Sequence, residues 1–218
     1  MTQKSLFAVA AAVLLLAFVA GVQFYTRVQS EAASQHAGTN REALIRMHSP
    51  SLGKADAPVV IVEFLDPACE TCAAFYPMVK QLLAAHPDKI RLVLRYAPFH
   101  QGSDKVVGVL VAAHRQGKFW PALEALLASQ QAWTEHHTAN VERVWPQLEG
   151  IGLNMEQMAF DMAAPEISSV IAQDLADARR LNVSKTPEFF VNGRPLPSFG
   201  FEQLRGLVDQ AVAEAGGG

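Results

Sequence analysis

VVIVEFLDPACETCAAF, residues 59–75, carries the strongest structural signal in the chain. Its first part, VVIVEFL, is apolar apart from Glu63, and such a run is typical of a strand that is buried on both faces. The two cysteines of the chain, Cys69 and Cys72, follow at once, and apolar residues then recur at helical spacing. The stretch therefore predicts a buried strand that delivers two thiols to the start of a helix.

The segments that follow extend this pattern. Residues 89–99, KIRLVLRYAPF, predict a second apolar strand, so that two strands flank a helix that begins at a C-x-x-C pair. This context is typical of thioredoxin-like redox proteins. Residues 187–197, PEFFVNGRPLP, predict a strand, an Asn-Gly hairpin turn and a short second strand, and an amphipathic helix follows at residues 201–215.

The intervening residues 103–181 have helical periodicity and no strand signal. We therefore predict an α/β protein with a thioredoxin fold and an inserted helical domain at residues 103–181. The thioredoxin-like core is assigned to residues 48–102 and 182–218. Residues 31–47, which are polar and Ala-rich, are assigned to a linker that is helical in part.

The first thirty residues differ in kind from the rest. Their unbroken apolar run, from Leu6 to Val22, exceeds the ~7–15 residues of a signal-peptide core and reaches the low end of the ~17–25 residues that span a bilayer. A small-x-small cleavage site at residues 30–32 lies far from this run. We therefore favour a membrane anchor at residues 1–30 over a cleaved signal. The expected location is the periplasm or the outer face of the inner membrane, with a soluble periplasmic form as the alternative.

Charge and cysteine count narrow the classes of function. Without residues 1–30 the chain holds 16 Lys and Arg against 21 Asp and Glu, a net charge of −5 with no basic run, so nucleic acid is not an expected partner. An oxidising compartment allows two thiols to form a disulfide. A disulfide across two intervening residues closes too short a loop to add much stability, so redox chemistry explains the pair better. We expect neither a cofactor nor a metal.

The spacing of the cysteines gives each thiol a different role. Cys69 lies at the first turn of the predicted helix, where unpaired N–H groups and the helix dipole stabilise a thiolate, so it is the expected nucleophile. Cys72 lies one turn further on and can resolve the mixed disulfide that Cys69 forms with a substrate. Glu63, if it is buried under the pair, has a raised pKa and can accept the proton of Cys72. On an edge strand Glu63 would instead point to water.

Several stretches resemble the DsbA-like thiol–disulfide oxidoreductases, particularly the membrane-tethered BdbD type: SLGKADAPVVIVEFLDPACETC, RYAPF, QGKFWPALEALL and LNVSKTPEFFVNGRPL. The most specific features are Glu63 six residues before Cys69, the C-x-x-C pair, and Thr186-Pro187 before a strand that ends in Asn-Gly. The resemblance covers about residues 47–215. It implies that Pro187 is cis and faces the cysteines, and that Thr186 presents backbone to a substrate peptide. It also implies cysteine-containing exported substrates and a membrane redox partner that resets the cysteines.

The dipeptide between the cysteines departs from that family. Many relatives carry Pro first and a His or aromatic residue second, whereas this chain carries Glu70 and Thr71. A carboxylate beside Cys69 opposes a second negative charge, and Thr71 adds no cation. We expect a reduction potential between roughly −120 mV, as in a strong oxidant, and −270 mV, as in thioredoxin. Such a potential suits selective oxidation or isomerisation.

The alternative function is a periplasmic copper(I)-binding chaperone of thioredoxin fold. Cys69 and Cys72 with a Met or a His would suit Cu(I). That role needs a His at a particular loop, and no His in the sequence is clearly placed there. His100, after the second strand, either tunes the thiolate or is an ordinary surface side chain. His136-His137 is expected in a solvated turn rather than in a metal site.

Overall fold

A mixed β-sheet forms the centre of the protein, with the strand order β1-β3-β2-β6-β7. β2 (Val59–Leu65) lies in the middle, parallel to β3 (Ile90–Tyr96) and antiparallel to β6 (Glu188–Val191). This central position explains why VVIVEFL lacks the alternation of a half-exposed strand. The short strands β1 (Ser51–Leu52) and β7 (Arg194–Pro195) occupy the edges.

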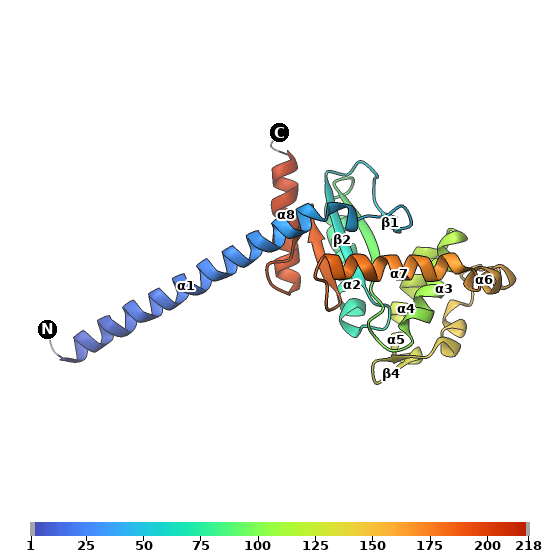
Figure 1. Cartoon of the computed structure of the whole chain (residues 1–218), viewed down its shortest axis with the longest axis horizontal. Helices are drawn as coiled ribbons and strands as arrows, with labels where there is room; N and C mark the ends of the chain where they lie inside the picture. The colour runs from blue at the N-terminus through green and yellow to red at the C-terminus, as the bar shows by residue number, and fades with distance from the viewer. Residues whose placement is uncertain (1–2, 217–218) are drawn as a thin grey trace.

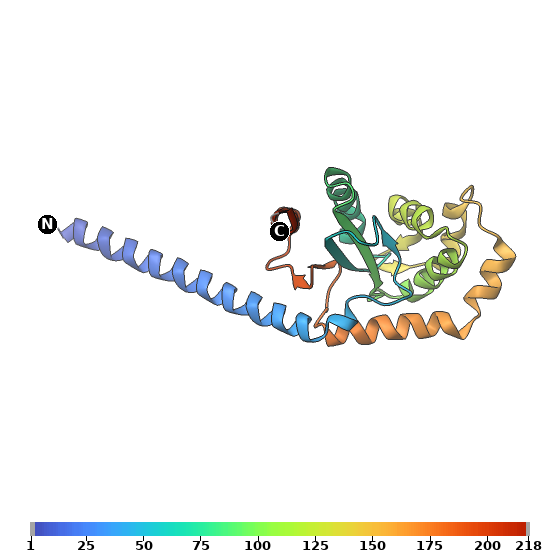
Figure 2. The same cartoon turned by 90° about the horizontal axis from the view of Figure 1, so that it is seen from above.

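The computed structural model describes residues 3–216, with side chains described at Phe7 and from residue 11 onward. The predicted outer limits of the anchor and of the core, residues 1 and 218, lie outside this part. Figures 1 and 2 show a long N-terminal helix, α1 (Gln3–Thr39), that projects from a body built around the sheet. In the body, the Asn192-Gly193 turn joins β6 to β7 with both residues in the left-handed region, at φ values of 48° and 81°.

Helices cover both faces of the sheet. α2 (Glu70–Ala85) and α8 (Phe201–Gly216) lie on one face, where their apolar side chains form a cluster with the strands: Val59, Ile61, Phe75, Val79, Leu82, Phe189, Leu204 and Val208. On the other face, the last turn of α7 (Pro165–Arg180) and the segment after α1 cover Val62 and Phe64 of β2.

Helices also fill most of the chain between β3 and β6, as the periodicity of residues 103–181 predicted. Besides α7, they are α3 (Ser103–Arg115), α4 (Phe119–Ala128), α5 (Gln130–Trp133), α6 (Met155–Met162) and the 3-10 turns Val141–Arg143 and Trp145–Leu148. A hairpin of β4 (Thr134–Glu135) and β5 (Thr138–Ala139) interrupts them. No strand was predicted there, because two-residue strands are too short to leave an alternating pattern.

The inserted helices share an apolar core with the cysteines. Cys69 and Cys72 belong to the same buried cluster as residues of α3 and α4, which include Val107, Leu110 and Leu123. The sheet side of this cluster is formed by Leu65, Leu94 and Tyr96. The insertion therefore packs directly against the thiol pair.

The helix α1 (Gln3–Thr39) is longer than the predicted apolar segment. It continues past residue 30 into the predicted linker, whose Ala-rich composition favours a helix. Within the described residues it is the one helix long and apolar enough to cross a membrane. The most apolar 18-residue window of Ala11–Thr39 has a mean hydropathy of 1.7, and none of that window is buried. Residues 31–39 of the predicted linker thus continue the helix.

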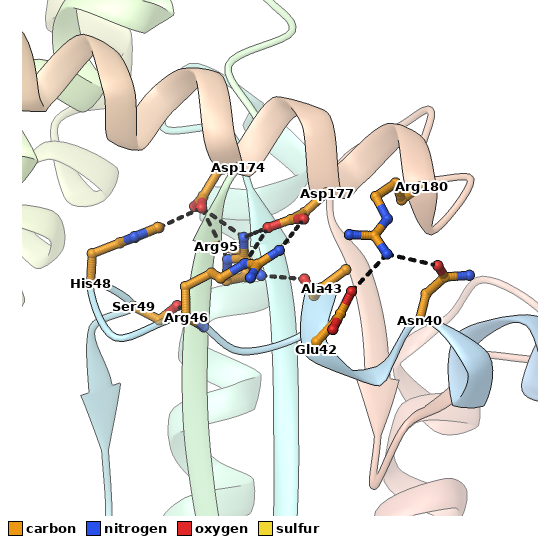
Figure 3. Close-up of polar contacts among 10 residues, drawn as sticks. All are labelled: Asn40, Glu42, Ala43, Arg46, His48, Ser49, Arg95, Asp174, Asp177 and Arg180. Atoms are coloured by element: carbon orange, nitrogen blue, oxygen red, sulfur yellow. Dashed lines mark hydrogen bonds and ion pairs between the residues drawn. The ribbon is translucent and has the colours of Figure 1, made fainter.

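A network of charged side chains fixes the segment after α1 to the body (Figure 3). Arg95 of β3 is fully buried and donates hydrogen bonds to Asp174 and Asp177 of α7, each at 2.7 Å. Arg46, which follows α1, donates to both carboxylate oxygens of Asp177 at 2.7 and 2.8 Å. At the end of α1, Nε2 of His36 lies 2.7 Å from the carbonyl oxygen of residue 180 in α7. The predicted linker is therefore held against α7 and β3.

Candidate active site

Both cysteines lie where β2 passes into α2. Cys69 is the N-cap residue of α2, with an extended backbone at φ −84° and ψ 117°, and Cys72 belongs to the first turn of the helix. Both are free thiols, and Cys69 keeps 5% of its surface exposed whereas Cys72 keeps none. Cys69 is therefore the member of the pair that a substrate can reach.

The surroundings of Cys69 stabilise its thiolate. The pKa of Cys69 is lowered to about 5, first by a hydrogen bond from the Cys72 thiol and then by hydrogen bonds from the Thr186 side chain and the backbone amides of Cys72 and Thr71. Burial opposes this shift but is outweighed. The amides are the unpaired N–H groups of a first helical turn. Cys69 is therefore ionised at neutral pH.

Cys72 has the opposite environment. Burial raises the pKa of Cys72 well above its ordinary value, and the hydrogen bond to Cys69 and the charge of Glu63 raise it further. At neutral pH Cys72 therefore keeps its proton and donates a hydrogen bond to the Cys69 thiolate. One thiolate and one thiol, side by side, form the asymmetric pair that thiol–disulfide exchange uses.

Glu63 is fully buried in β2, on the side of the sheet that α2 covers. It is paired with Leu94 of β3 and Phe189 of β6, so its strand is central and the alternative of a solvent-facing edge position does not hold. Neither carboxylate oxygen of Glu63 has a hydrogen-bond partner among the described residues. Burial, with a smaller contribution from the charge on Cys69, raises the pKa of Glu63 to about 8. Such a carboxyl can exchange a proton near neutral pH.

The peptide bond between Thr186 and Pro187 is cis. The Cys69 thiol lies 3.3 Å from the carbonyl oxygen of Thr186, to which it can donate a hydrogen bond when protonated. The pairing of β6 with β2 brings these two residues together across 117 positions of sequence. Backbone groups of the bend before β6 therefore border the reactive sulfur.

Glu70 and Thr71, the residues between the cysteines, are both exposed. Oε2 of Glu70 lies 3.1 Å from Nδ1 of His137, which comes from the turn between β4 and β5. His136-His137 thus forms the exposed turn expected from the sequence, but one of the two rings also contacts the dipeptide. The sequence carries no signal for this contact, because the two residues are 67 positions apart.

Two further residues shape the site and were not identified from the sequence. Asp66, buried directly after β2, accepts a hydrogen bond from the backbone amide of Ala68 at 2.9 Å. Gln130 of α5 donates to the carbonyl oxygens of Pro67 and Cys69 at 2.7 and 3.0 Å. Asp before Pro is a turn signal that could have drawn attention to Asp66. Gln130 is 61 residues from Cys69, and no local pattern indicates its contact.

Known proteins with this architecture include oxidoreductases. The sequence model of the Thioredoxin family matches residues 46–210. A crystal structure of a thioredoxin-like oxidoreductase from Silicibacter pomeroyi DSS-3 is 34% identical, with a TM-score of 0.68 over 78% of this chain and 96% of that chain. The crystal structure of oxidised BdbD from Bacillus subtilis is 20% identical, with a TM-score of 0.68 over 76% of this chain and 94% of that chain. The probable disulfide bond formation protein D of Bacillus anthracis is 28% identical over 174 residues, which are 74% of this chain and 77% of that protein.

Other relatives are much larger proteins. The Na(+)/H(+) antiporter NhaA of Herminiimonas arsenicoxydans is 31% identical over 163 residues, which are 75% of this chain but 24% of the antiporter. The chain thus spans about a quarter of the length of such relatives. The family match nevertheless covers most of the chain, and the relatives include a BdbD and a disulfide bond formation protein D. The chain therefore belongs to the thioredoxin family, with the helical insertion and the resemblance to DsbA-like proteins that its sequence predicted.

Proposed function

We propose that the protein is an exported thiol–disulfide oxidoreductase that exchanges disulfides with cysteines of other proteins. This proposal rests on one observation: two neighbouring thiols have pKa values that are shifted in opposite directions. The pKa of Cys69 is lowered to about 5 by hydrogen bonds at the start of α2, whereas burial raises the pKa of Cys72. A structural pair would have no need of one ionised, accessible sulfur beside one buried thiol.

The exchange proceeds through a mixed disulfide on Cys69. When the protein oxidises a client, a client thiolate attacks Cys69 Sγ of the Cys69–Cys72 disulfide and Cys72 leaves. A second client thiolate then attacks the client sulfur, and Cys69 leaves as a thiolate. Two electrons pass from the client to the protein, and a membrane redox partner accepts them to restore the disulfide. In the reducing direction, Cys72 attacks Cys69 Sγ to release the client.

Glu63 is proposed to hold the proton that Cys72 must lose or gain. Its carboxyl is buried, lies near enough for its charge to raise the pKa of Cys72, and has a pKa of about 8. A group with this pKa can accept a proton at pH 7–8 when the buried thiol must become a nucleophile. It can return the proton when Cys72 leaves as a thiolate.

Substrate binding is proposed to use Thr186 and Pro187, whose backbone borders Cys69. Glu70 and Thr71 are proposed to set a potential between roughly −120 and −270 mV. The contact between Glu70 and His137 supports a moderated effect of this carboxylate, since a hydrogen bond from the imidazole to the carboxylate weakens its repulsion of the Cys69 thiolate. Oxidation of selected clients and isomerisation of wrong disulfides are both compatible with such a potential.

The apolar helix α1 supports an N-terminal anchor formed by residues 1–30, with the body in the periplasm or at the outer face of the inner membrane. We also propose the division into a core of residues 48–102 and 182–218 and an insertion of residues 103–181. The change from strands to helices at Ser103 and the return to a strand at Glu188 support these limits.

Trapping of clients tests the assignment of the thiols. Cys72→Ser should accumulate mixed disulfides with exported proteins, visible as bands that a reductant removes, because the resolving thiol is lost. Cys69→Ser is the matched control and should accumulate none. Rapid alkylation at pH 6 should label Cys69 in the wild type. Preferential labelling of Cys72, or equal trapping by both variants, would contradict the proposal.

A further inference from the structure

We propose that Glu70, His100 and His137 form a Zn²⁺ site at the rim of the thiol pair. One ligand atom from each of these three residues lies within 4.8 Å of the other two. Two imidazoles and a carboxylate are a ligand set that zinc takes in proteins, with a fourth position left for water or a substrate group. The site uses neither thiol, so it goes beyond the proposed redox function and can fail or hold independently of it.

His100 is held in a ligand orientation by a buried carboxylate. Oδ2 of Asp66 lies 2.7 Å from Nδ1 of His100 and also accepts the backbone amides of Phe99 and His100 at 2.7 and 2.8 Å. A carboxylate that accepts these hydrogen bonds requires the proton of the ring to be on Nδ1. Nε2 of His100 is then the free ligand atom, in the carboxylate–histidine arrangement that orients zinc ligands in proteins.

His137 is brought to the same place by backbone pairing. β5 forms a parallel bridge between Thr138 and Gln101, and the amide of Ala139 donates to the carbonyl of Gln101 at 2.8 Å. Gly102 permits this close approach, since a Cβ there would lie 2.5 Å from the carbonyl oxygen of Ala139. The residues that follow the two histidines are thus joined, and the rings stack with centroids 5.8 Å apart.

The turn that carries His137 has an uncommon pair of residues for its conformation. His136 and His137 both have positive φ values, 47° and 60°, where a two-residue hairpin usually has Asn-Gly or Gly-Gly. The turn between β6 and β7 has Asn192-Gly193 in that role. Two histidines in left-handed conformations therefore cost conformational energy that a ligand role for one of them explains. His136 is 93% exposed and is not among the three clustered residues, which makes it a natural control.

The ligand atoms must approach one another when a cation binds. Tetrahedral zinc with bonds of ~2.0–2.1 Å places its ligand atoms about 3.3 Å apart. The side chains of Glu70 and His137 are 54% and 69% exposed, so both can rotate to close this gap. The three residues come from α2, from the loop after β3 and from the insertion, so a bound ion would join the insertion to the core beside Cys69.

The test titrates the full-length chain in detergent, with Cys69 and Cys72 as a disulfide, with Zn²⁺ in a competition assay against a chromogenic chelator. We expect one equivalent to bind and the midpoint of thermal unfolding to rise. His137→Asn should weaken binding at least tenfold, and His136→Asn should leave it unchanged. Asn tolerates positive φ at both positions, so the turn is kept. Equal affinities of the two variants, or no binding by the wild type, would overturn the proposal.

Two further variants test whether loss of binding reflects misfolding and whether the cysteines bind the metal. Glu70→Gln keeps the size of an exposed side chain and should also bind at least tenfold more weakly, which covers the case in which His137→Asn does not fold. The double variant with Cys69→Ser and Cys72→Ser should bind Zn²⁺ like the wild type. Loss of binding in that variant would show that Zn²⁺ binding depends on the cysteines and would overturn the site. Mixed-disulfide trapping by Cys72→Ser, measured with a chelator present, tests the redox function separately.

Discussion

Two groups of buried carboxylates in this protein have opposite properties. Glu63 is fully buried without a hydrogen-bond partner among the described residues, and burial raises its pKa to about 8. Asp174 and Asp177 are equally buried, yet hydrogen bonds from His48, Arg46 and Arg95 outweigh burial and lower both pKa values, that of Asp177 to about 2.

The difference shows that pairing, and not burial, decides what a buried carboxylate does. The paired aspartates stay ionised and hold β3, α7 and the segment after α1 together. The unpaired glutamate is close to neutral at pH 7 and remains available to exchange a proton. A buried charged group without a partner destabilises the folded state, and such groups are found mostly at functional sites.

The largest expected effect is on stability when Glu63 is neutralised. A pKa raised from 4.5 to about 8 means that the folded reduced protein loses stability as the pH rises from 4.5 through 8. Relative to Glu63→Gln, the wild type should be less stable above pH 8 by on the order of 5 kcal/mol, and by little below pH 4.5. Chemical denaturation at pH 4.5, 7 and 9 measures this difference.

Glu124→Gln provides the contrast for that experiment. Glu124 is paired with Lys80 at 2.9 Å and its pKa is lowered, chiefly by that hydrogen bond, so its effect should be small and of the opposite sign. If the difference in free energy of unfolding between the wild type and Glu63→Gln does not change with pH, Glu63 is not a buried acid with a raised pKa.

The next effect concerns the paired group. Arg95→Met leaves Asp174 and Asp177 buried without their shared partner, and breaking a buried ion pair in this way costs about 3–5 kcal/mol. The same denaturation measurement at pH 7 should show this loss. Arg194→Met, which removes a surface pair with Glu214, should cost less than about 1 kcal/mol. Similar losses of stability in Arg95→Met and Arg194→Met would contradict the expectation that the buried ion pairs stabilise the fold more than the exposed pair.

The smallest effect is kinetic and separates proton exchange from stability. Glu63→Gln should slow resolution of the mixed disulfide about 100-fold at pH 7, which is about 2.7 kcal/mol in activation free energy. In the wild type the rate should rise with pH to about 8, as Glu63 loses its proton, and the variant should lack this rise. Quenched-flow analysis of a model mixed disulfide would measure this rate at each pH. Parallel pH profiles would exclude Glu63 from the proton transfer.

Much of the thiol site could be predicted because its signals are local. Glu63, Cys69 and Cys72 lie within ten residues, so one strand followed by one helix start fixes their relation. The position of Pro187 beside them came from the family resemblance, since no local pattern specifies which distant turn faces a given helix.

The unpredicted contacts join residues that are far apart in sequence. Arg95 and Asp174 are 79 residues apart, and Gln130 and Cys69 are 61 apart. A single charged residue in a strand or a helix does not reveal its partner, because the partner depends on how the elements pack. The point at which α1 ends was not predicted either: the polar, Ala-rich residues 31–47 predict a linker that is helical in part, and nothing in their sequence marks Thr39 as the last helical residue.

If α1 is the proposed membrane anchor, its direct passage into the charge network would set the distance between the thiols and the membrane. With residues up to Val22 in a bilayer, the helical residues 23–39 rise by about 25 Å at 1.5 Å per residue. A flexible tether would let the body occupy a broad range of distances from the membrane, whereas a stiff helical arm would hold it within a narrow layer above the lipid surface. Clients would then be selected partly by geometry, since cysteines displayed at that distance from the membrane would meet Cys69 far more often than those nearer or further away.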